Sequence, residues 1–168
     1  MTNAAQSSPI DKIELVTQIR QKLEAELQSI TQAAKAAHEA ATHEESKAED
    51  SHDTRGLESS YLAGAAAQRA ADIQQQIYLY KIMEPKTFKD GDAVGPTAIV
   101  EVENNGKRSF YFVAPQGGGM KIQLGKHSIQ VITPQSPLGD EIMGRKTGDI
   151  LEIEAQGVTR EYEIISIH

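Results

Sequence analysis

The sequence has 168 residues, of which 39% are hydrophobic and only 5% aromatic, and a formal net charge of −7 at pH 7. This length suits one or two domains, and the absence of cysteine excludes disulfides, thiolate nucleophiles and cysteine-based metal sites. We find no secretory signal and no apolar run near the roughly 18 residues of a membrane span, so we expect a cytoplasmic protein with no membrane partner. Negative charge disfavours phosphate contacts, so we expect no independent sequence-specific DNA binding.

The N-terminal part predicts a disordered tail over residues 1–8 and then a long helix. Ser8 suits the helix cap, Pro9 the first turn and Asp11 the acidic position of a capping box. From there to about residue 48 there is no Gly or Pro, and the composition favours a helix. The apolar positions recur at spacings of three and four, close to a heptad, at Val16, Ile19, Leu23, Leu27, Ile30, Ala34, Ala37 and Ala41.

A second seam with the same spacing follows further along the chain, at Ala66, Ala70, Ile73, Ile77 and Tyr80. Large residues come first in the first seam and last in the second, which is the order that an antiparallel pair requires. We therefore predict that residues 9–83 form an antiparallel coiled-coil hairpin with its turn around residues 49–56. An arm of nearly 40 residues would extend roughly 55–60 Å at 1.5 Å per residue.

The far end of this hairpin is acidic, with the stretch HEESKAEDSHDTRGLESSY at residues 43–61. One interpretation is a solvated end that stays polar because it cannot pack. The histidines indicate no zinc site, because His38 and His43 would lie about 140° apart around a helix. Gly56 could supply a positive φ in the turn, and Arg55 could steady the acids or contact a partner.

After Pro85, which ends the second helix, residues 86–168 predict a compact α+β domain. TAIVEVENNGKRSFYFVA predicts two strands joined at Asn105 and Gly106, the strongest short hairpin signal. MKIQL and HSIQVIT predict further strands, and DILEIEA and TREYEIISI predict two more around Gly157. QGGGMK predicts a strand connection, because it lacks the Gly-Lys-Ser/Thr ending of a phosphate loop.

The segment SPLGDEIMGRKTGDILEIEAQGVTREYEIISI, residues 136–167, carries the most specific pattern. Ser136 suits the cap of a single helical turn and Pro137 its first position. The segment resembles the C-terminal domain of the Gre family of bacterial transcription elongation factors. That family has a Ser-Pro-Leu-Gly segment before a short helix, a Gly-Lys-Lys-x-Gly-Asp-like turn and closing strands with a Glu-Tyr-Glu-Ile-like run. Positions 136–139, 144–149 and 161–164 match these features.

The resemblance implies an antiparallel coiled coil followed by an antiparallel β domain similar to FK506-binding prolyl isomerases (FKBP-like), without isomerase activity. In the family the coiled coil enters the secondary channel of RNA polymerase, where acids at its tip help hold a second Mg²⁺. The two metals activate water that cleaves the 3′ end of backtracked RNA. Bacterial RNA polymerase is therefore the implied partner, the nascent RNA 3′ end an indirect one, and the chain needs no cofactor of its own. The isolated chain should be catalytically inert.

The acidic stretch departs from the tip pattern of the family, Gly-Asp-Leu-Ser-Glu-Asn-Ala-Glu-Tyr. If Tyr61 takes the place of the tyrosine, the Asp falls on Thr54 and the first Glu on Leu57, while acids stand one residue away at Asp53 and Glu58. The resemblance makes Asp53 and Glu58 the candidates for assisting catalysis in trans. The candidate contacts to the shared Mg²⁺ are Asp53, Glu58, Glu49 and Asp50.

Three functions therefore stay open. The first is an elongation factor that stimulates transcript cleavage, and the second is a regulator that occupies the same channel without cleavage, which the displaced acids favour. The third is an adaptor whose hairpin grips an unrelated protein. Candidate partner contacts are Arg55, Gly56, Ser136, Pro137, Leu138 and Gly139.

Overall fold

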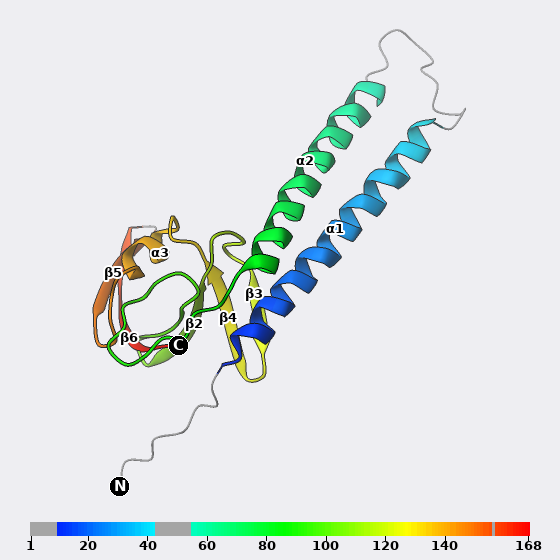
Figure 1. The fold of residues 1–168 in the computed structure, drawn as a ribbon. Coiled ribbons are helices and arrows are strands. Elements are labelled where there is room, and N and C mark those ends of the chain that lie inside the picture. Colours follow the sequence, from blue (N-terminus) through cyan, green and yellow to red (C-terminus); the bar gives the residue numbers. More distant parts are fainter. Residues whose placement is uncertain (1–9, 43–54, 156) are drawn as a thin grey trace. The chain divides into compact units, whose positions relative to one another are not determined.

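The structure is a computed structural model that describes residues 10–42, 55–155 and 157–168. It confirms the α+β class, with two long helices followed by a six-stranded sheet and a short third helix (Figure 1). The helices are α1 Lys12–Thr42, α2 Arg55–Ile82 and α3 Pro137–Ile142. The strands are β1 Ile99–Asn104, β2 Lys107–Val113, β3 Lys121–Leu124, β4 His127–Ile132, β5 Ile150–Ala155 and β6 Val158–Ile167.

The chain divides into two compact units. One is the hairpin unit, Ile19–Ile82, and the other joins the described residues up to Gln18 to Met83–His168. Each unit has buried apolar side chains of its own, and each is described below by itself.

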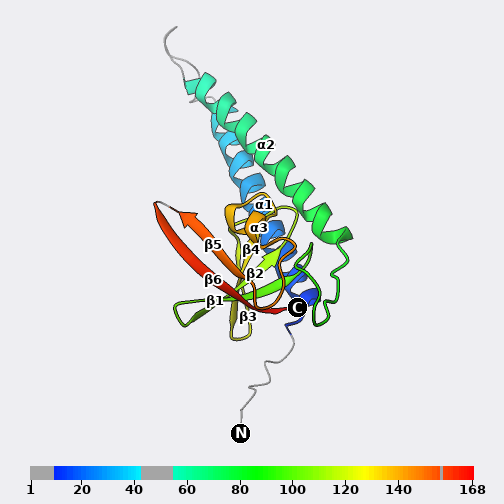
Figure 2. The same ribbon diagram turned by 90° about the vertical axis from the view of Figure 1, so that its left-hand side faces the viewer.

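In the hairpin unit, α1 and α2 lie side by side and run antiparallel, as Figures 1 and 2 show from two directions. Ile19 and Leu23 of α1 and Ile73 and Tyr80 of α2 are at most 1% exposed, so the predicted seam is the buried one. Seam residues nearer the far end are only half-buried, and Ala37 is exposed. Burial begins to fall at Leu27 and Ile30, before the seam side chains become small.

The first turn of α1 differs from the prediction. The predicted cap, Ser8, lies outside the described residues, and the helix begins at Lys12. The Asp11 Oδ1 atom accepts hydrogen bonds from the backbone N–H groups of Ile13 (2.9 Å) and Glu14 (3.1 Å). Asp11 is therefore the cap itself, and its placement inside the first turn was wrong. A short carboxylate side chain that satisfies two otherwise free N–H groups fixes where a helix starts.

In the other unit the strands form one sheet in the order β3-β4-β2-β1-β6-β5. The predicted hairpin turn is present, with Asn105 at φ 51° and Gly106 at φ 76°, the positive values that a type I′ turn requires. All neighbouring strands are antiparallel except β2 and β4, which are parallel. The sheet is thus mixed, because β3 occupies the edge and β4 returns beside β2 in the same direction.

A hydrophobic cluster covers one face of this sheet. Ile142 of α3 is fully buried in it, so the short helix closes the core over the strands. The buried members are Val94, Ala98, Val100, Val102, Val113, Ile132, Ile142, Leu151 and Ile164. This packing holds the loops around α3 in fixed positions.

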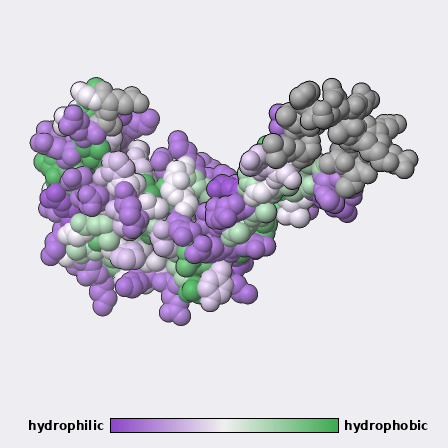
Figure 3. All heavy atoms as spheres, turned by 90° about the horizontal axis from the view of Figure 1, so that it is seen from above, coloured by the Kyte–Doolittle hydropathy of each residue, from purple (hydrophilic) through white to green (hydrophobic). Residues whose placement is uncertain are grey.

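The face of the molecule drawn in Figure 3 is mainly polar. In Figure 3 the face seen from above is mostly hydrophilic, and hydrophobic atoms form small, separated areas. Over the part of the chain that the structure describes, no helix has the length and apolar character needed to cross a membrane.

Candidate functional site

Of the four acids predicted to bind a metal ion, the structure describes one. Glu58 lies in the first turn of α2 and its side chain is exposed. Glu49, Asp50 and Asp53 lie outside the described residues, so their roles stay predictions. Within residues 10–42, 55–155 and 157–168, no group of three or more His, Cys, Asp or Glu side chains could hold a metal ion.

The start of α2 corrects the predicted turn. Arg55 and Gly56 both belong to the helix, whereas the sequence had placed them in a turn over residues 49–56. Gly56 has a helical backbone, so the positive φ expected there was wrong. Residues 49–54 of that turn lie outside the described part. The partner-binding roles of Arg55 and Gly56 stay predictions.

Two large apolar side chains stand beside Glu58 on the surface of α2. Tyr61 is 72% exposed and Leu62 is 70% exposed, and they follow Glu58 by three and four residues. Residues at these spacings share one face of a helix. We call Glu58, Tyr61 and Leu62 the distal face. Neither Tyr61 nor Leu62 was predicted to be a contact, although Tyr61 lies well away from the seam through Ala66 and Ala70.

An ion pair fixes the register of the two helices that carry this face. The Arg69 Nη2 atom on α2 lies 2.6 Å from the Glu26 Oε1 atom on α1. Both side chains are partly exposed, so the pair should stabilise the hairpin by only about 0.2–1 kcal/mol. The ion pair matters mainly because it links α1 to α2 at one point along their length.

The Ser-Pro-Leu-Gly segment has a structural explanation. The Ser136 hydroxyl donates to the Thr133 carbonyl (2.7 Å) and accepts from the Gly139 N–H (3.1 Å), while Pro137 occupies the first turn of α3. A Cβ atom on Gly139 would lie 1.9 Å from the Thr133 carbonyl oxygen, so only glycine fits. Leu138 packs half-buried against the core, and Pro137 is exposed. Partner binding by these four residues stays a prediction.

Glycine conformations and hydrogen bonds also define the following turn, residues 144–149. Gly144 (φ 77°) and Gly148 (φ 89°) have backbones that favour glycine. The Asp149 Oδ2 atom accepts from the Lys146 N–H at 2.8 Å. The Gly144 N–H donates to the Val94 carbonyl at 2.9 Å. The pattern of glycine and aspartate that the sequence matched is therefore the pattern needed to form this turn.

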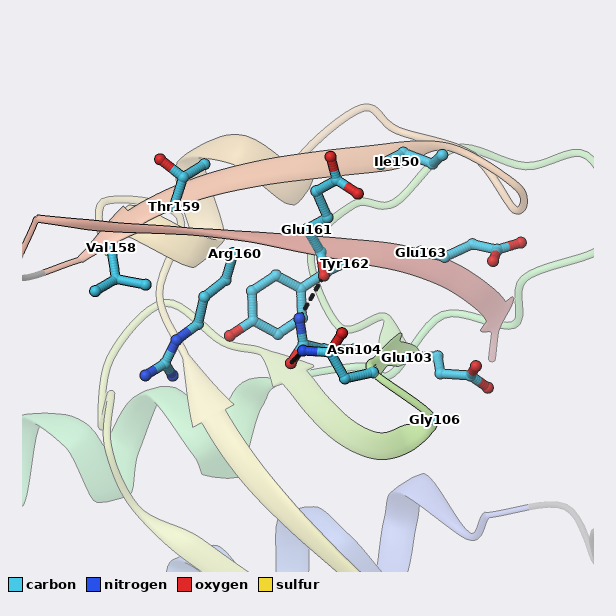
Figure 4. A pocket seen from close by; sticks show the side chains of 11 residues that line it. Glu103, Asn104, Gly106, Ile150, Val158, Thr159, Arg160, Glu161, Tyr162 and Glu163 are labelled. Atoms are coloured by element: carbon cyan, nitrogen blue, oxygen red, sulfur yellow. Dashed lines mark hydrogen bonds between the residues drawn. The ribbon is translucent and has the colours of Figure 1, made fainter.

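An open groove of about 700 Å³ lies beside β6 and the β1–β2 turn (Figure 4). Ile150 and Val158 are 62% and 54% exposed at its walls. The Asn104 Nδ2 atom donates to the Glu161 carbonyl at 2.6 Å, the dashed line of Figure 4, and ties β1 to β6. The charged side chains along the groove are Glu103, Arg160, Glu161 and Glu163.

One further polar cluster resembles a catalytic arrangement but does not form one. The Ser166 hydroxyl lies 2.9 Å from the Glu101 Oε2 atom and 3.0 Å from the His168 Nε2 atom. The serine therefore stands between acid and base, whereas a Ser-His-Asp triad needs the imidazole in the middle. Burial lowers the pKa of His168, and the hydrogen bond to Glu101 raises the pKa of Arg108. The hydrogen bond from Ser166 on β6 to Glu101 on β1 links these two strands.

Comparisons with known proteins identify the family. The profile of the family described as "Transcription elongation factor, GreA/GreB, C-term" matches residues 89–168. Transcription elongation factor GreA of Streptococcus agalactiae serotype Ia is 33% identical over 116 residues, 65% of this chain and 68% of that protein. GreA of Thermotoga maritima is 25% identical over 105 residues, 62% of this chain and 63% of that protein, so this match spans less than two thirds of the relative.

The chain is also similar to solved structures of GreA factor homologs. GreA factor homolog 1 of Thermus thermophilus is 23% identical, covers 93% of this chain and 94% of that chain, and has a TM-score of 0.36. The Thermus aquaticus protein Gfh1 is 24% identical over 88% of this chain and 92% of that chain, with a TM-score of 0.38. On the family profile and the Streptococcus relative, this chain belongs to the GreA/GreB family of transcription elongation factors.

Proposed function

We propose that this protein binds bacterial RNA polymerase, in the cytoplasm, and places the far end of its helical hairpin in the secondary channel of the enzyme. Membership of the GreA/GreB family supports the choice of partner. The observation that carries the proposal is the distal face, where Glu58 stands beside the exposed Tyr61 and Leu62. Apolar side chains exposed next to each other provide a surface that a partner could cover.

The distal face would act through its carboxylate. Mg²⁺ prefers a few carboxylate oxygens and several waters to a closed protein cage. Glu58, together with Asp53, would therefore complete the coordination of a second ion that the polymerase also holds, with Glu49 and Asp50 as further donors. Such a pair of metals stabilises both the attacking and the leaving oxygen during hydrolysis. Tyr61 and Leu62 would pack against the channel wall and hold the carboxylate in place.

Neutralising the two central acids tests this role. We expect the double variant Asp53→Asn/Glu58→Gln to bind core polymerase as the parent does but to lose stimulated cleavage of backtracked RNA, because an amide is a poor ligand for Mg²⁺. Cleavage is measured on a stalled elongation complex with labelled RNA, and binding by co-sedimentation. Asp72→Asn, on the same helix, is the matched control and should cleave as the parent does. Parent protein that binds the complex but yields no shortened RNA contradicts the cleavage mechanism.

A second function is favoured by one specific observation. When the family tip pattern is aligned on Tyr61, its two acids fall on Thr54 and Leu57. A protein that enters the channel without correctly placed carboxylates would regulate transcription by occupying the channel. The same assay separates the two functions, because such a regulator binds polymerase and alters initiation or pausing while the RNA stays intact.

A further inference from the structure

A groove at the start of α1 surrounds the amine of Lys12. It has a volume of about 390 Å³ and is lined by residues 10–13, residues 85–88 and His168. All of these residues belong to the same compact unit. Its walls are partly apolar, with Ile10, Pro85 and Phe88 around the lysine. The groove uses no residue of the distal face.

Two contacts hold the Lys12 nitrogen in place. The Nζ atom donates a hydrogen bond to the Lys86 carbonyl at 2.5 Å, and it lies 4.5 Å from the centroid of the Phe88 ring. A neutral amine keeps the first contact, because one N–H donates while the nitrogen lone pair remains free. The carbonyl therefore orients the nitrogen in a state in which it can act as a nucleophile.

Burial of the amine disfavours its charged form. Burial lowers the pKa of Lys12 from 10.5 to about 8. At pH 7.5 roughly a quarter of such amines are neutral, against about one in a thousand at the ordinary pKa. The charged and titratable groups that face the amine are Asp11 from its own helix, Lys86 from the segment 85–88, and His168 from the end of β6, with Glu101 behind it.

We propose that Lys12 is a site of covalent N-acylation by small acyl phosphates. The neutral amine attacks the carbonyl carbon, so that an N–C bond forms as the C–O bond to phosphate breaks. The phosphate leaves with the electron pair, and the amine proton passes to water or to the departing phosphate. The Asp11 carboxylate accepts hydrogen bonds from the helix N–H groups. Lys86 also lines the groove, and its positive charge would attract the anionic donor.

Acylation would weaken the contacts between Lys12 in the first turn of α1 and residues 86 and 88. The amide carries no charge, so the attraction to the face of the Phe88 ring is lost. The larger group also displaces the nitrogen from the Lys86 carbonyl. Backbone amides near Lys12 should consequently exchange with solvent faster after acylation, which gives a readout that needs no polymerase.

The test is labelling of the full chain with acetyl phosphate across pH 6.5–9.5, followed by peptide mass mapping. We expect Lys12 to react at least tenfold faster at pH 7.5 than the exposed Lys81 and Lys89, with a rate that levels off above pH 8. In denaturant Lys12 should be acetylated no faster than Lys81 and Lys89. A Lys12 rate no greater than that of Lys81, or one that still rises tenfold per pH unit through pH 9, overturns the proposal.

Substitutions at the groove test its cause. Lys12→Arg should remove the fast label and leave the slow ones unchanged. Phe88→Ala should admit water to the groove, so the pH at which Lys12 reacts at half its maximal rate should move toward 10.5. Phe88→Leu keeps the groove apolar, so this pH should stay near or below 8. If both Phe88 variants behave as the parent does, enclosure of the amine is not the cause and the proposal fails. Circular dichroism confirms that each variant is folded.

Discussion

Gly139 stands at a point where the chain leaves no room for a side chain. Its virtual Cβ atom would meet the carbonyl of Thr133 at 1.9 Å, and that carbonyl is held by the Ser136 hydroxyl. The sequence identified this segment by its similarity to a family motif and predicted the cap and the proline. It could not show the close approach, which depends on how the chain folds back between β4 and α3.

A single methyl group at this position should therefore be costly. We expect Gly139→Ala to lower the free energy of unfolding by about 2 kcal/mol or more, because backbone must move to relieve the clash. Gly64→Ala is the matched control: nothing lies within 4 Å of its Cβ position in α2. That change should stabilise the helix by up to about 1 kcal/mol. Urea unfolding measures both, and equal effects would show that the clash is relieved at no cost.

Tyr80 makes the stability of the hairpin depend on alkaline pH. Its side chain is 1% exposed, and burial raises the pKa of its phenol well above 10. The folded state therefore resists ionisation, so its stabilisation is complete below pH 10 and is lost as the pH rises above that value. The loss should be about 1.4 kcal/mol per pH unit relative to Tyr80→Phe, which cannot ionise.

Unfolding at fixed pH values between 9 and 11.5 checks this slope. The Tyr78→Phe variant provides the comparison on the same helix, since the Tyr78 side chain is 60% exposed. It should show the same alkaline loss as the parent protein. A Tyr80→Phe variant that loses stability as steeply as the parent would assign the effect to another group.

At the scale of elements, the helical hairpin was the most predictable part of the molecule. The spacing placed Ile19 and Leu23 on the seam of the first helix and Ile73 on the seam of the second, and all three are buried. The start of α1 was less predictable, because Ser8 and Asp11 are both good capping residues and only the structure shows which one accepts the helix N–H groups. The parallel pairing of β2 with β4 could not be predicted either, because alternation identifies strands but not their neighbours.

The buried seam should carry the stability of the hairpin unit. We expect Ile73→Ala to cost about 2–5 kcal/mol, because it removes a fully buried side chain and leaves a cavity between the helices. Leu62→Ala, which truncates a side chain that is 70% exposed on the same helix, should change stability by less than about 0.5 kcal/mol. Urea unfolding followed by helical circular dichroism tests the pair, and similar losses would argue against the seam.

At the scale of the whole molecule, the residues that identify the family and the proposed contact surface belong to different units. One unit carries the motifs that identify the family, and the hairpin unit carries the distal face. The sequence led to Glu58 through a family pattern, but it did not identify Tyr61 and Leu62 as a contact surface. The position of Tyr61 away from the seam was visible in the sequence. The high exposed fractions of Tyr61 and Leu62, 72% and 70%, became evident only from the structure.

The most direct test of the account is site-specific photo-crosslinking to RNA polymerase in a backtracked elongation complex. A photoreactive phenylalanine derivative replaces Tyr61 in one sample and Tyr78 in another, since both side chains are exposed on α2. The account predicts that the position 61 probe crosslinks to polymerase segments beside the catalytic centre or to the extruded RNA 3′ end, and that the position 78 probe does not reach them. Binding in which position 61 yields no crosslink near that centre would contradict it.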